Sequence, residues 1–286
     1  MIKLILSRKG FDSSAGKKPS PIFPDGTMLS LPIPDKASPI CYRDIAGNQH
    51  ASVGELVHDL APQVLPTYRA HLDPDLSFQS IPRADGWRPL FGQEGDAESH
   101  LENQGVGPGD IFLFFGLFRE VERSVDGWRY VRGSRPMHVI FGWLQAAKRV
   151  AVSNWPTDAA WALYHPHFRR EPHPRNVVYV SAERLQLPGL ESSAIPGAGL
   201  FAAFNPKLQL TEPQCVRPGR WLLPDWFHPD GRASALTYHG GAARWQKSKG
   251  GVMLDSAYRG QEFVLNCDHY PEAIDWIREL LVLTAT

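Results

Sequence analysis

The chain has 286 residues, of which 43% are hydrophobic, so it can bury a sizeable core as one large domain or two ordinary ones. Its 30 basic and 30 acidic residues cancel, which excludes the global positive field of an obvious nucleic-acid binder. No apolar run approaches the roughly 20 residues that cross a bilayer. The three cysteines are too scattered for a disulfide framework or a CxxC metal site. We therefore expect a cytoplasmic protein with no membrane partner.

The first predicted strand, residues 2–6, runs into a polar loop rich in glycine, serine, proline and basic residues. Small residues after a strand let backbone N–H groups converge on an anion. Asp12 is the preferred acid, base or metal ligand of this loop, because Asp25 precedes a glycine and equally fits a turn. The alternative is an exposed loop, since neither nucleotide-binding glycine motif is present. The predicted phosphate-binding residues are Arg8, Lys9, Ser13, Ser14 and Lys17.

Three helices are predicted along the chain. Residues 52–62 begin with the capping box of Ser52 and Glu55, followed by an apolar stripe. Residues 95–104 form a weaker amphipathic pattern, and residues 271–283 begin with a proline and carry apolar residues at helical spacing. Helices should therefore be few and peripheral.

Strands are predicted over residues 111–118, 137–145 and 177–185, and the last third of the chain adds strands and loops over 220–229, 235–245 and 260–266. The first two each contain Phe-Gly, and a glycine inside a strand indicates a bulge, a bend or a closely approaching group. The sequence predicts an α+β fold: one strand-rich unit over 1–286 with a small curved β-barrel core and a few peripheral helices. An N-terminal lobe over 1–104 would precede a barrel-like portion over 105–286.

Histidines gather in one proline-rich segment that contains His165, His167 and His173. An H-x-H pair in an extended segment puts both rings on one side, as a metal site requires. No third ligand is identifiable, so a surface loop is the preferred interpretation and no metal site is predicted. His138 and His239 are candidate acid–base catalysts because imidazole titrates near neutrality, with hydrogen-bonded core histidines as the alternative.

Nine tryptophans, several of them next to arginines, suit a pocket that stacks a base while pairing with a phosphate. The alternative is that these rings fill the core. Asn103 and Asp110 are further groups that could bond the edge of a base. The predicted base-binding residues are Trp87, Gln93, Phe115, Trp143 and Gln145.

Several stretches together resemble a known family: LSRKGFDSSAGKKPSPIFPDGTMLSLPIP, HLDPDL, GWRPLFGQ, HLENQGVGPGDIFLFFGLF, HVIFGWLQ, WLLPDWF and LTYH. Their order is similar to that in the bacterial and phage nucleotide-modification-associated domain family, third type, over nearly the whole chain. The resemblance implies a setting in DNA base modification without assigning a reaction. GVGPGDIFLFFGLF followed by HVIFGWLQ also resembles the strand pair of PUA-like barrels, including ASCH and EVE domains, which bind RNA or modified nucleotides. The long charged insert between these strands departs from that pattern.

Three functions remain open. The leading hypothesis is a nucleotide- or DNA-interacting protein of a base-modification or phage-defence system, with a base in an aromatic pocket and a phosphate on the N-terminal loop. The second is a nucleotide transferase or hydrolase in which Asp12 works with His138 or His239. The third is a non-catalytic assembly subunit that binds other proteins of such a system. The sequence does not specify a cofactor.

Overall fold

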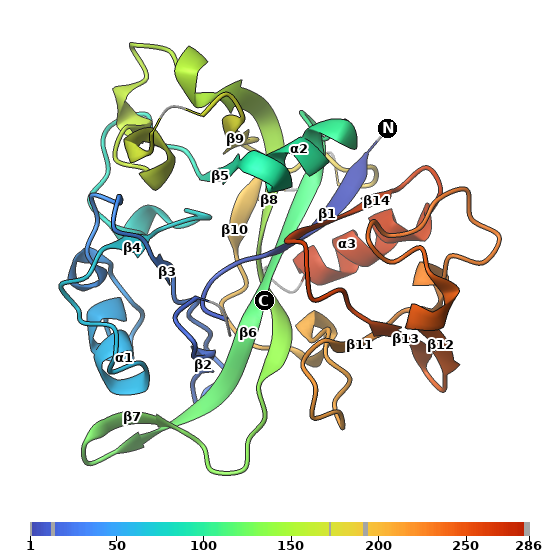
Figure 1. Ribbon diagram of the computed structural model, residues 1–286, viewed down its shortest axis with the longest axis horizontal. Coiled ribbons are helices and arrows are strands. Elements are labelled where there is room, and N and C mark those ends of the chain that lie inside the picture. Colours follow the sequence, from blue (N-terminus) through green and yellow to red (C-terminus); the bar gives the residue numbers. More distant parts are fainter. Residues whose placement is uncertain (1, 13–14, 172, 191–193, 283–286) are drawn as a thin grey trace.

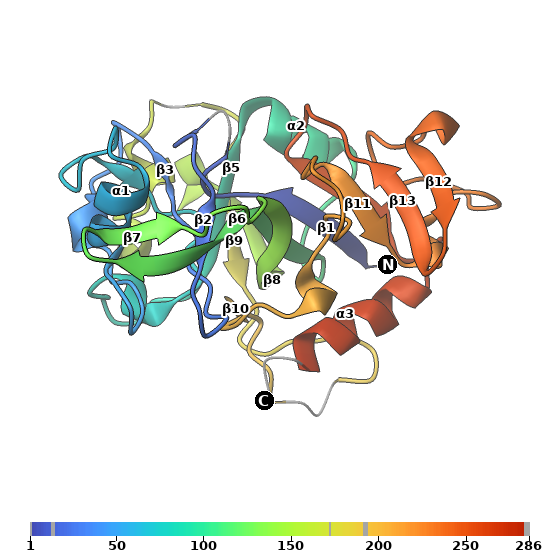
Figure 2. The ribbon, with the colours of Figure 1, turned by 90° about the horizontal axis from the view of Figure 1, so that it is seen from below.

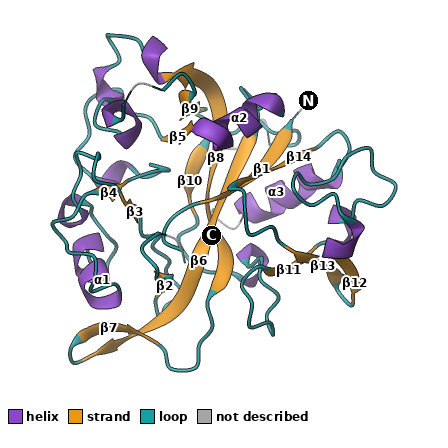
Figure 3. Cartoon of the chain, viewed as in Figure 1, coloured by secondary structure: helices purple, strands orange, loops and turns teal. Residues whose placement is uncertain are grey.

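The computed structural model describes residues 2–12, 15–171, 173–190 and 194–282, and it has the predicted α+β class (Figures 1 and 3). All three predicted helices are present: α1 (Val53–Leu60), α2 (Gly95–Asn103) and α3 (Glu272–Val282). The capping box of α1 is confirmed, because the Ser52 backbone N–H donates to the Glu55 carboxylate at 2.8 Å and Glu55 N–H donates to Ser52 Oγ at 3.2 Å.

Nine strands form the main sheet, whose central path runs β14 (Glu262–Asn266), β1 (Lys3–Arg8), β6 (Ile111–Ser124), β8 (Met137–Ala151), β9 (Asn176–Ser181) and β5 (Leu90–Glu94). Three short strands branch from it: β2 (Ser20–Ile22) and β7 (Gly127–Tyr130) pair with β6, and β10 (Ala198–Leu200) pairs with β8. Two smaller sheets comprise β11 (Arg220–Leu223), β13 (Gly251–Asp255) and β12 (Trp245–Ser248), and β3 (Ile33–Pro34) with β4 (Ala70–His71).

The main sheet is open, and the predicted PUA-like barrel is not confirmed. Its path ends at β14 and β5, and within the described residues these two strands do not pair with each other. The charged insert after residue 118 lengthens β6 and forms a hairpin with β7, which extends away from the sheet toward α1 (Figure 2). Strand pairing between distant segments therefore decided the architecture.

The close approach of neighbouring backbone explains the glycine in each of the two Phe-Gly pairs. A Cβ on Gly116 would lie 2.8 Å from the backbone oxygen of Lys9, and one on Gly142 would lie 2.9 Å from that of Gly199. The pairing of β6 with β8 also changes register between Phe114 and Phe115. The predicted bulge and close approach are both confirmed, because no larger residue leaves room for the crossing backbone.

Two main apolar clusters stabilise the fold, and each contains residues of β6. The larger one covers the sheet and includes α3, and the smaller one packs α1 and its neighbouring loops against Val121 and Trp128. Figures 1 and 2 show α1 and β7 at one end of the molecule and β11, β13 and α3 at the other. The division into a lobe over 1–104 and a portion over 105–286 stays a prediction.

Helix α2 is anchored by a buried carboxylate, Glu98, which accepts hydrogen bonds from Arg149 Nη2 at 2.6 Å and Tyr179 Oη at 3.1 Å. Burial raises the pKa of Glu98 from 4.5 to about 7, although the bonds with Arg149 oppose the shift. The native carboxyl therefore holds its proton more tightly than the unfolded one. Its contribution to stability is complete below the unfolded pKa and is lost as the pH rises through the folded pKa.

This linkage predicts a pH-dependent difference between the wild type and a Glu98→Gln variant. Glutamine keeps an acceptor for Arg149 but cannot titrate, so the wild type should lose on the order of 3 kcal/mol relative to the variant as the pH crosses this window. Denaturant unfolding of both proteins at several pH values measures the difference. Parallel pH profiles would contradict it.

Candidate functional site

A cavity of about 640 Å³ lies where segments far apart in the sequence meet. The end of β1 contributes Arg8 and Lys9, β5 contributes Gly92 and Gln93, and the loop before β14 contributes Arg259. Helix α2, the segment after β4 and the 3₁₀ helix of residues 166–169 complete the wall. The lining mixes cationic, acidic and aromatic side chains, as polar ligands require.

One side of the cavity is an ion-pair network around Glu262. Lys9 Nζ and Gln93 Nε2 donate to Glu262 Oε1 at 2.9 and 2.6 Å. Arg8 instead donates to the backbone oxygens of Ala257 and Tyr258 at 2.9 and 3.1 Å. Burial lowers the pKa of Arg8 below its usual range. Among the described residues, the hydrogen bonds of Arg8 go to carbonyl oxygens, while the Asp12 carboxylate favours its charged form electrostatically.

Tyr238 supplies an aromatic surface to the cavity. It is a non-glycine residue in the left-handed region, with φ of 67°, and its side chain is 49% exposed. The His100 ring lies behind it, with 4.6 Å between the ring centroids, and His100 Nε2 contacts Thr237 Oγ1 at 3.1 Å. Such backbone conformations carry a cost and concentrate at functional sites. The Tyr238 ring is therefore available to stack on a planar ligand.

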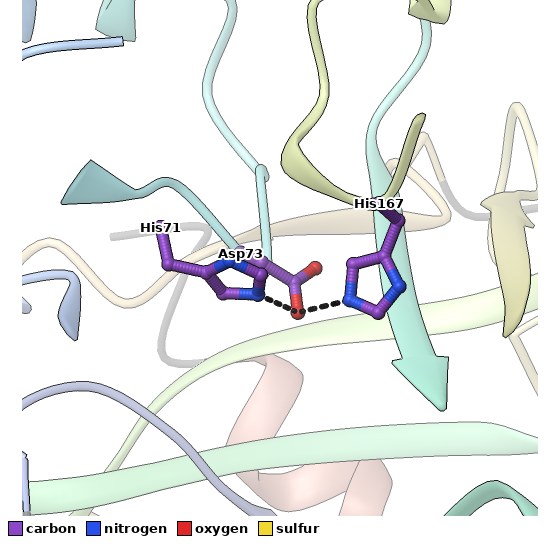
Figure 4. A group of neighbouring side chains, drawn as sticks. All are labelled: His71, Asp73 and His167. Carbon is purple, nitrogen blue, oxygen red and sulfur yellow. Dashed lines mark ion pairs between the residues drawn. The ribbon is translucent and has the colours of Figure 1, made fainter. Parts of the chain in front are cut away.

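A cluster of His71, Asp73 and His167 forms the opposite wall (Figure 4). The two rings lie on either side of the carboxylate, with Asp73 Oδ2 at 3.6 Å from His71 Nε2 and 4.0 Å from His167 Nε2. All three ligand atoms lie within 4.8 Å of one another. The group is buried, and it could hold a metal ion.

The surface-loop interpretation of the H-x-H segment was wrong. His165 and His167 are 0% and 3% exposed, and their rings stack with 5.6 Å between centroids, whereas His173 is exposed. The third group that the sequence left unidentified comes from the H-x-D of residues 71–73, which lies within the quoted stretch HLDPDL. Two short motifs, H-x-D and H-x-H, were the available signal, but their sequence separation concealed the contact.

The cluster is electrostatically coupled. Burial would raise the pKa of Asp73, but the neighbouring His165 and His71 rings hold it well below its usual range. Burial opposes the charged form of His71 as well, yet its bonds with Asp35 and Asp73 raise its pKa. Burial lowers the pKa of His167 to about 4, so this ring is neutral at physiological pH.

Four of the predicted site residues line this cavity: Arg8, Lys9, Asp12 and Gln93. The Asp12 carboxylate accepts a hydrogen bond from the Ala15 backbone N–H at 2.8 Å, which shapes the start of the loop. Lys17 is exposed and lies outside the lining, and Ser13 and Ser14 lie outside the described residues. Tyr238 and His71 were missed by the sequence analysis, although both occur in the quoted stretches LTYH and HLDPDL.

The predicted base-binding residues other than Gln93 do not line the cavity. Trp87 donates to Tyr164 Oη at 2.6 Å, and Trp143 donates to the backbone oxygen of Pro196 at 3.1 Å. Phe115 is fully buried in the main cluster. Gln145 Nε2 donates to the backbone oxygens of Gly109 and Gln186 at 3.1 and 2.8 Å. These contacts link neighbouring segments of the fold.

Neither His138 nor His239 lines the cavity; His239 is fully buried, and His138 is half-buried. His138 Nδ1 accepts a hydrogen bond from Trp221 Nε1 at 2.9 Å, and burial lowers the pKa of His138 to about 3. His239 contacts the Thr237 carbonyl through Nδ1 at 2.7 Å and accepts from the Ala257 N–H through Nε2 at 2.9 Å. Burial lowers its pKa to about 4. Both rings are therefore neutral and engaged in structural hydrogen bonds.

Within the part of the chain that the structure describes, no helix combines the length and apolar character that crossing a bilayer requires.

Comparison with known proteins adds one finding to this geometry, the family of the chain. Searches of curated proteins and of solved structures gave no match. The family model described as nucleotide modification associated domain 3 matches residues 3–266. The chain therefore belongs to the nucleotide modification associated domain 3 family.

Proposed function

We propose that the cavity binds a nucleotide, or one nucleotide unit of DNA, in a base-modification or phage-defence system. Family membership supports a role associated with nucleotide modification. The volume of about 640 Å³ lies within the range of roughly 300–1,000 Å³ typical of small-molecule sites. The observation that carries the proposal is the exposed Tyr238 ring in a cavity that also contains arginines with charge available for a phosphate.

The ion pairs in the cavity decide which cations have charge available for a phosphate. Lys9 pairs with Glu262, and Arg170 pairs with Glu94, so these cations are largely neutralised. Arg8 donates to backbone oxygens, and Arg259 is exposed. Arg8 and Arg259 are therefore the cations best able to bind a phosphate, while the base stacks on Tyr238.

Binding should depend on the ring of Tyr238. Base stacking contributes about 1–3 kcal/mol, so a Tyr238→Ala variant should bind nucleoside monophosphates roughly 5- to 150-fold more weakly. A Tyr238→Phe variant keeps the ring and should bind like the wild type. Isothermal titration with normal and modified nucleotides and short single-stranded DNA measures these affinities.

Two further variants separate phosphate recognition from general charge. An Arg259→Ala variant should bind more weakly and with a smaller dependence on salt. Lys17→Ala removes an exposed cation outside the cavity and should leave the affinity unchanged. Equal affinities for the wild type, Tyr238→Ala and Arg259→Ala would refute the proposed site.

A second candidate function is a nucleotide-modifying enzyme, because the His71, Asp73 and His167 cluster lies in the same cavity. Asp12 lines this cavity and stays the proposed acid or base of such an enzyme. Conversion of a nucleotide by the wild type and its loss in an Asp12→Asn variant would support this function. Unaltered turnover in that variant would remove Asp12 from the reaction.

A further inference from the structure

We propose that His71, Asp73 and His167 bind one divalent transition-metal ion, with open coordination positions that face the cavity. The inference goes beyond nucleotide binding, because metal uptake by these side chains does not require a nucleotide. Three independent features of the structure support it: the tautomer of each ring, the tight support of each ligand, and the distances between the ligand atoms.

The tautomer of His167 follows from its hydrogen-bond partners. Asn176 Nδ2 donates to the backbone oxygen of His167 at 2.8 Å, which fixes the orientation of the Asn176 amide. Asn176 Oδ1 therefore faces His167 Nδ1, at 2.6 Å, and accepts a hydrogen bond from the N–H at that position. Since Nδ1 carries the hydrogen in the neutral ring, His167 Nε2 presents a lone pair toward Asp73.

His71 and Asp73 are held in the same way. His71 Nδ1 lies 2.8 Å from Asp35 Oδ2, which can only accept, so in the neutral ring His71 Nε2 also presents a lone pair to the cluster. Asp73 Oδ1 accepts the backbone N–H of Gly92 at 2.7 Å, which leaves Oδ2 for the centre of the cluster. Two imidazole lone pairs and a carboxylate oxygen therefore converge, an arrangement that a cation stabilises.

The support of each ligand is typical of metal sites, in which histidines donate their second N–H to a carboxylate or carbonyl oxygen. Gly92 is part of this support. A Cβ at that position would lie 2.7 Å from His167 Nε2, so the close approach of the ring requires glycine. The sequence of β5 is thus adapted to the position of His167.

The distances fit one small ion. Nitrogen and oxygen ligands at about 2.1 Å from a metal lie roughly 3.0–3.5 Å apart. The observed separations from Asp73 Oδ2 are 3.6 and 4.0 Å, and all three ligand atoms lie within 4.8 Å of one another, so binding one ion requires the ligands to move closer by between a few tenths of an ångström and about 1 Å. Two imidazoles and one carboxylate favour Zn²⁺, Fe²⁺, Co²⁺ or Mn²⁺ over Mg²⁺ or Ca²⁺, which prefer oxygen ligands.

His165 is a further group at this site. It is fully buried, and neither ring nitrogen has a hydrogen-bond partner among the described residues. Its Nε2 lies 3.3 Å from Asp73 Oδ1. An unpartnered buried imidazole beside the ligands can serve as a fourth ligand or hold the carboxylate.

The test uses full-length protein without a histidine tag, stripped with a chelator and reconstituted separately with Zn²⁺ and Co²⁺. We expect one ion per chain by elemental analysis, and visible absorption from bound Co²⁺. Asp73→Asn keeps the size and the acceptor for Gly92, and His167→Ala removes one ligand. Each should lose at least 90% of the bound ion while its unfolding midpoint stays near that of the metal-free wild type.

Two further variants test whether metal uptake is specific to the proposed ligands. His173→Ala removes the exposed histidine of the same segment and should keep one ion per chain. Asn176→Ala removes only the support of His167 and should weaken metal affinity about 10- to 100-fold. Uptake that is equal in the wild type and Asp73→Asn, or absent from both, would overturn the proposal. Absent uptake would instead favour a protonated His71 shared by Asp35 and Asp73.

The metal site and the nucleotide site can fail separately. Tyr238→Ala should keep the ion and lose nucleotide affinity, whereas Asp73→Asn should lose the ion. Where both hold, the ion faces the bound nucleotide and can polarise it or lower the pKa of a bound water. That last step rests on the proposed nucleotide binding.

Discussion

Replacing Asp75 with alanine is expected to lower the free energy of unfolding by about 3–5 kcal/mol, the largest loss we expect from removing one charge. Asp75 accepts two hydrogen bonds from Arg83, both at 2.6 Å, and both side chains are 0% exposed. Tyr164 Oη donates to the same carboxylate. Removing Asp75 leaves the guanidinium buried with no counter-charge, and denaturant unfolding measures the cost.

A double variant separates lost attraction from the cost of an orphaned charge. Asp75→Leu combined with Arg83→Met removes both ions and fills the space with apolar groups, so it should regain most of the stability that Asp75→Ala loses. The comparison matters for the site because Asp75 is two residues from Asp73. A loss below about 1 kcal/mol in Asp75→Ala would show that Arg83 finds other partners.

A Trp221→Ala variant should lose about 3–5 kcal/mol, because it leaves a large cavity in the main apolar cluster. Trp221 is fully buried and packs edge-on against Phe115, with 5.1 Å between ring centroids. Its Nε1 donates to His138 Nδ1 at 2.9 Å. Denaturant unfolding monitored by circular dichroism measures the loss without relying on tryptophan fluorescence.

Trp221→Phe isolates the hydrogen bond from the packing. Phenylalanine keeps much of the ring contact but leaves His138 Nδ1 without its donor, at a cost of about 1–3 kcal/mol. Because the pKa of His138 is lowered to about 3, protonation near neutral pH cannot replace the missing donor. A Trp221→Phe variant as unstable as Trp221→Ala would contradict this division, because the ring that phenylalanine keeps would then contribute no stability.

Local sequence signals predicted much of the secondary structure. The Ser52 and Glu55 capping box began α1, and the apolar run from Ile111 gave the first half of β6. The Phe-Gly pairs identified the positions where backbones cross closely. These features depend on contacts within a few residues or on the chemistry of one position, so they can be recognised without the fold.

The same local signals do not determine whether the main sheet closes into a barrel or stays open. Whether β14 pairs with β5 depends on segments far apart in the sequence, so the inner strands were predicted correctly while the PUA-like barrel is not confirmed. Residues 235–245 were predicted to add strand and loop structure; in this range only Trp245 begins a strand, and Tyr238 occupies a left-handed turn beside the cavity. Long-range pairing overrides local propensity in such cases.

By itself, the sequence determined the α+β class, the three helices, the inner strands and the position of Arg8 and Lys9 at the end of the first strand, because these follow from periodicity, capping and strand ends. Only the tertiary structure decided which polar residues share one cavity. It brought His71 and Asp73 beside His167, buried Trp143, and paired His138 with Trp221. The reason is that β5 and β9 pair across a long stretch of chain, and burial then sets the charge of each group they enclose.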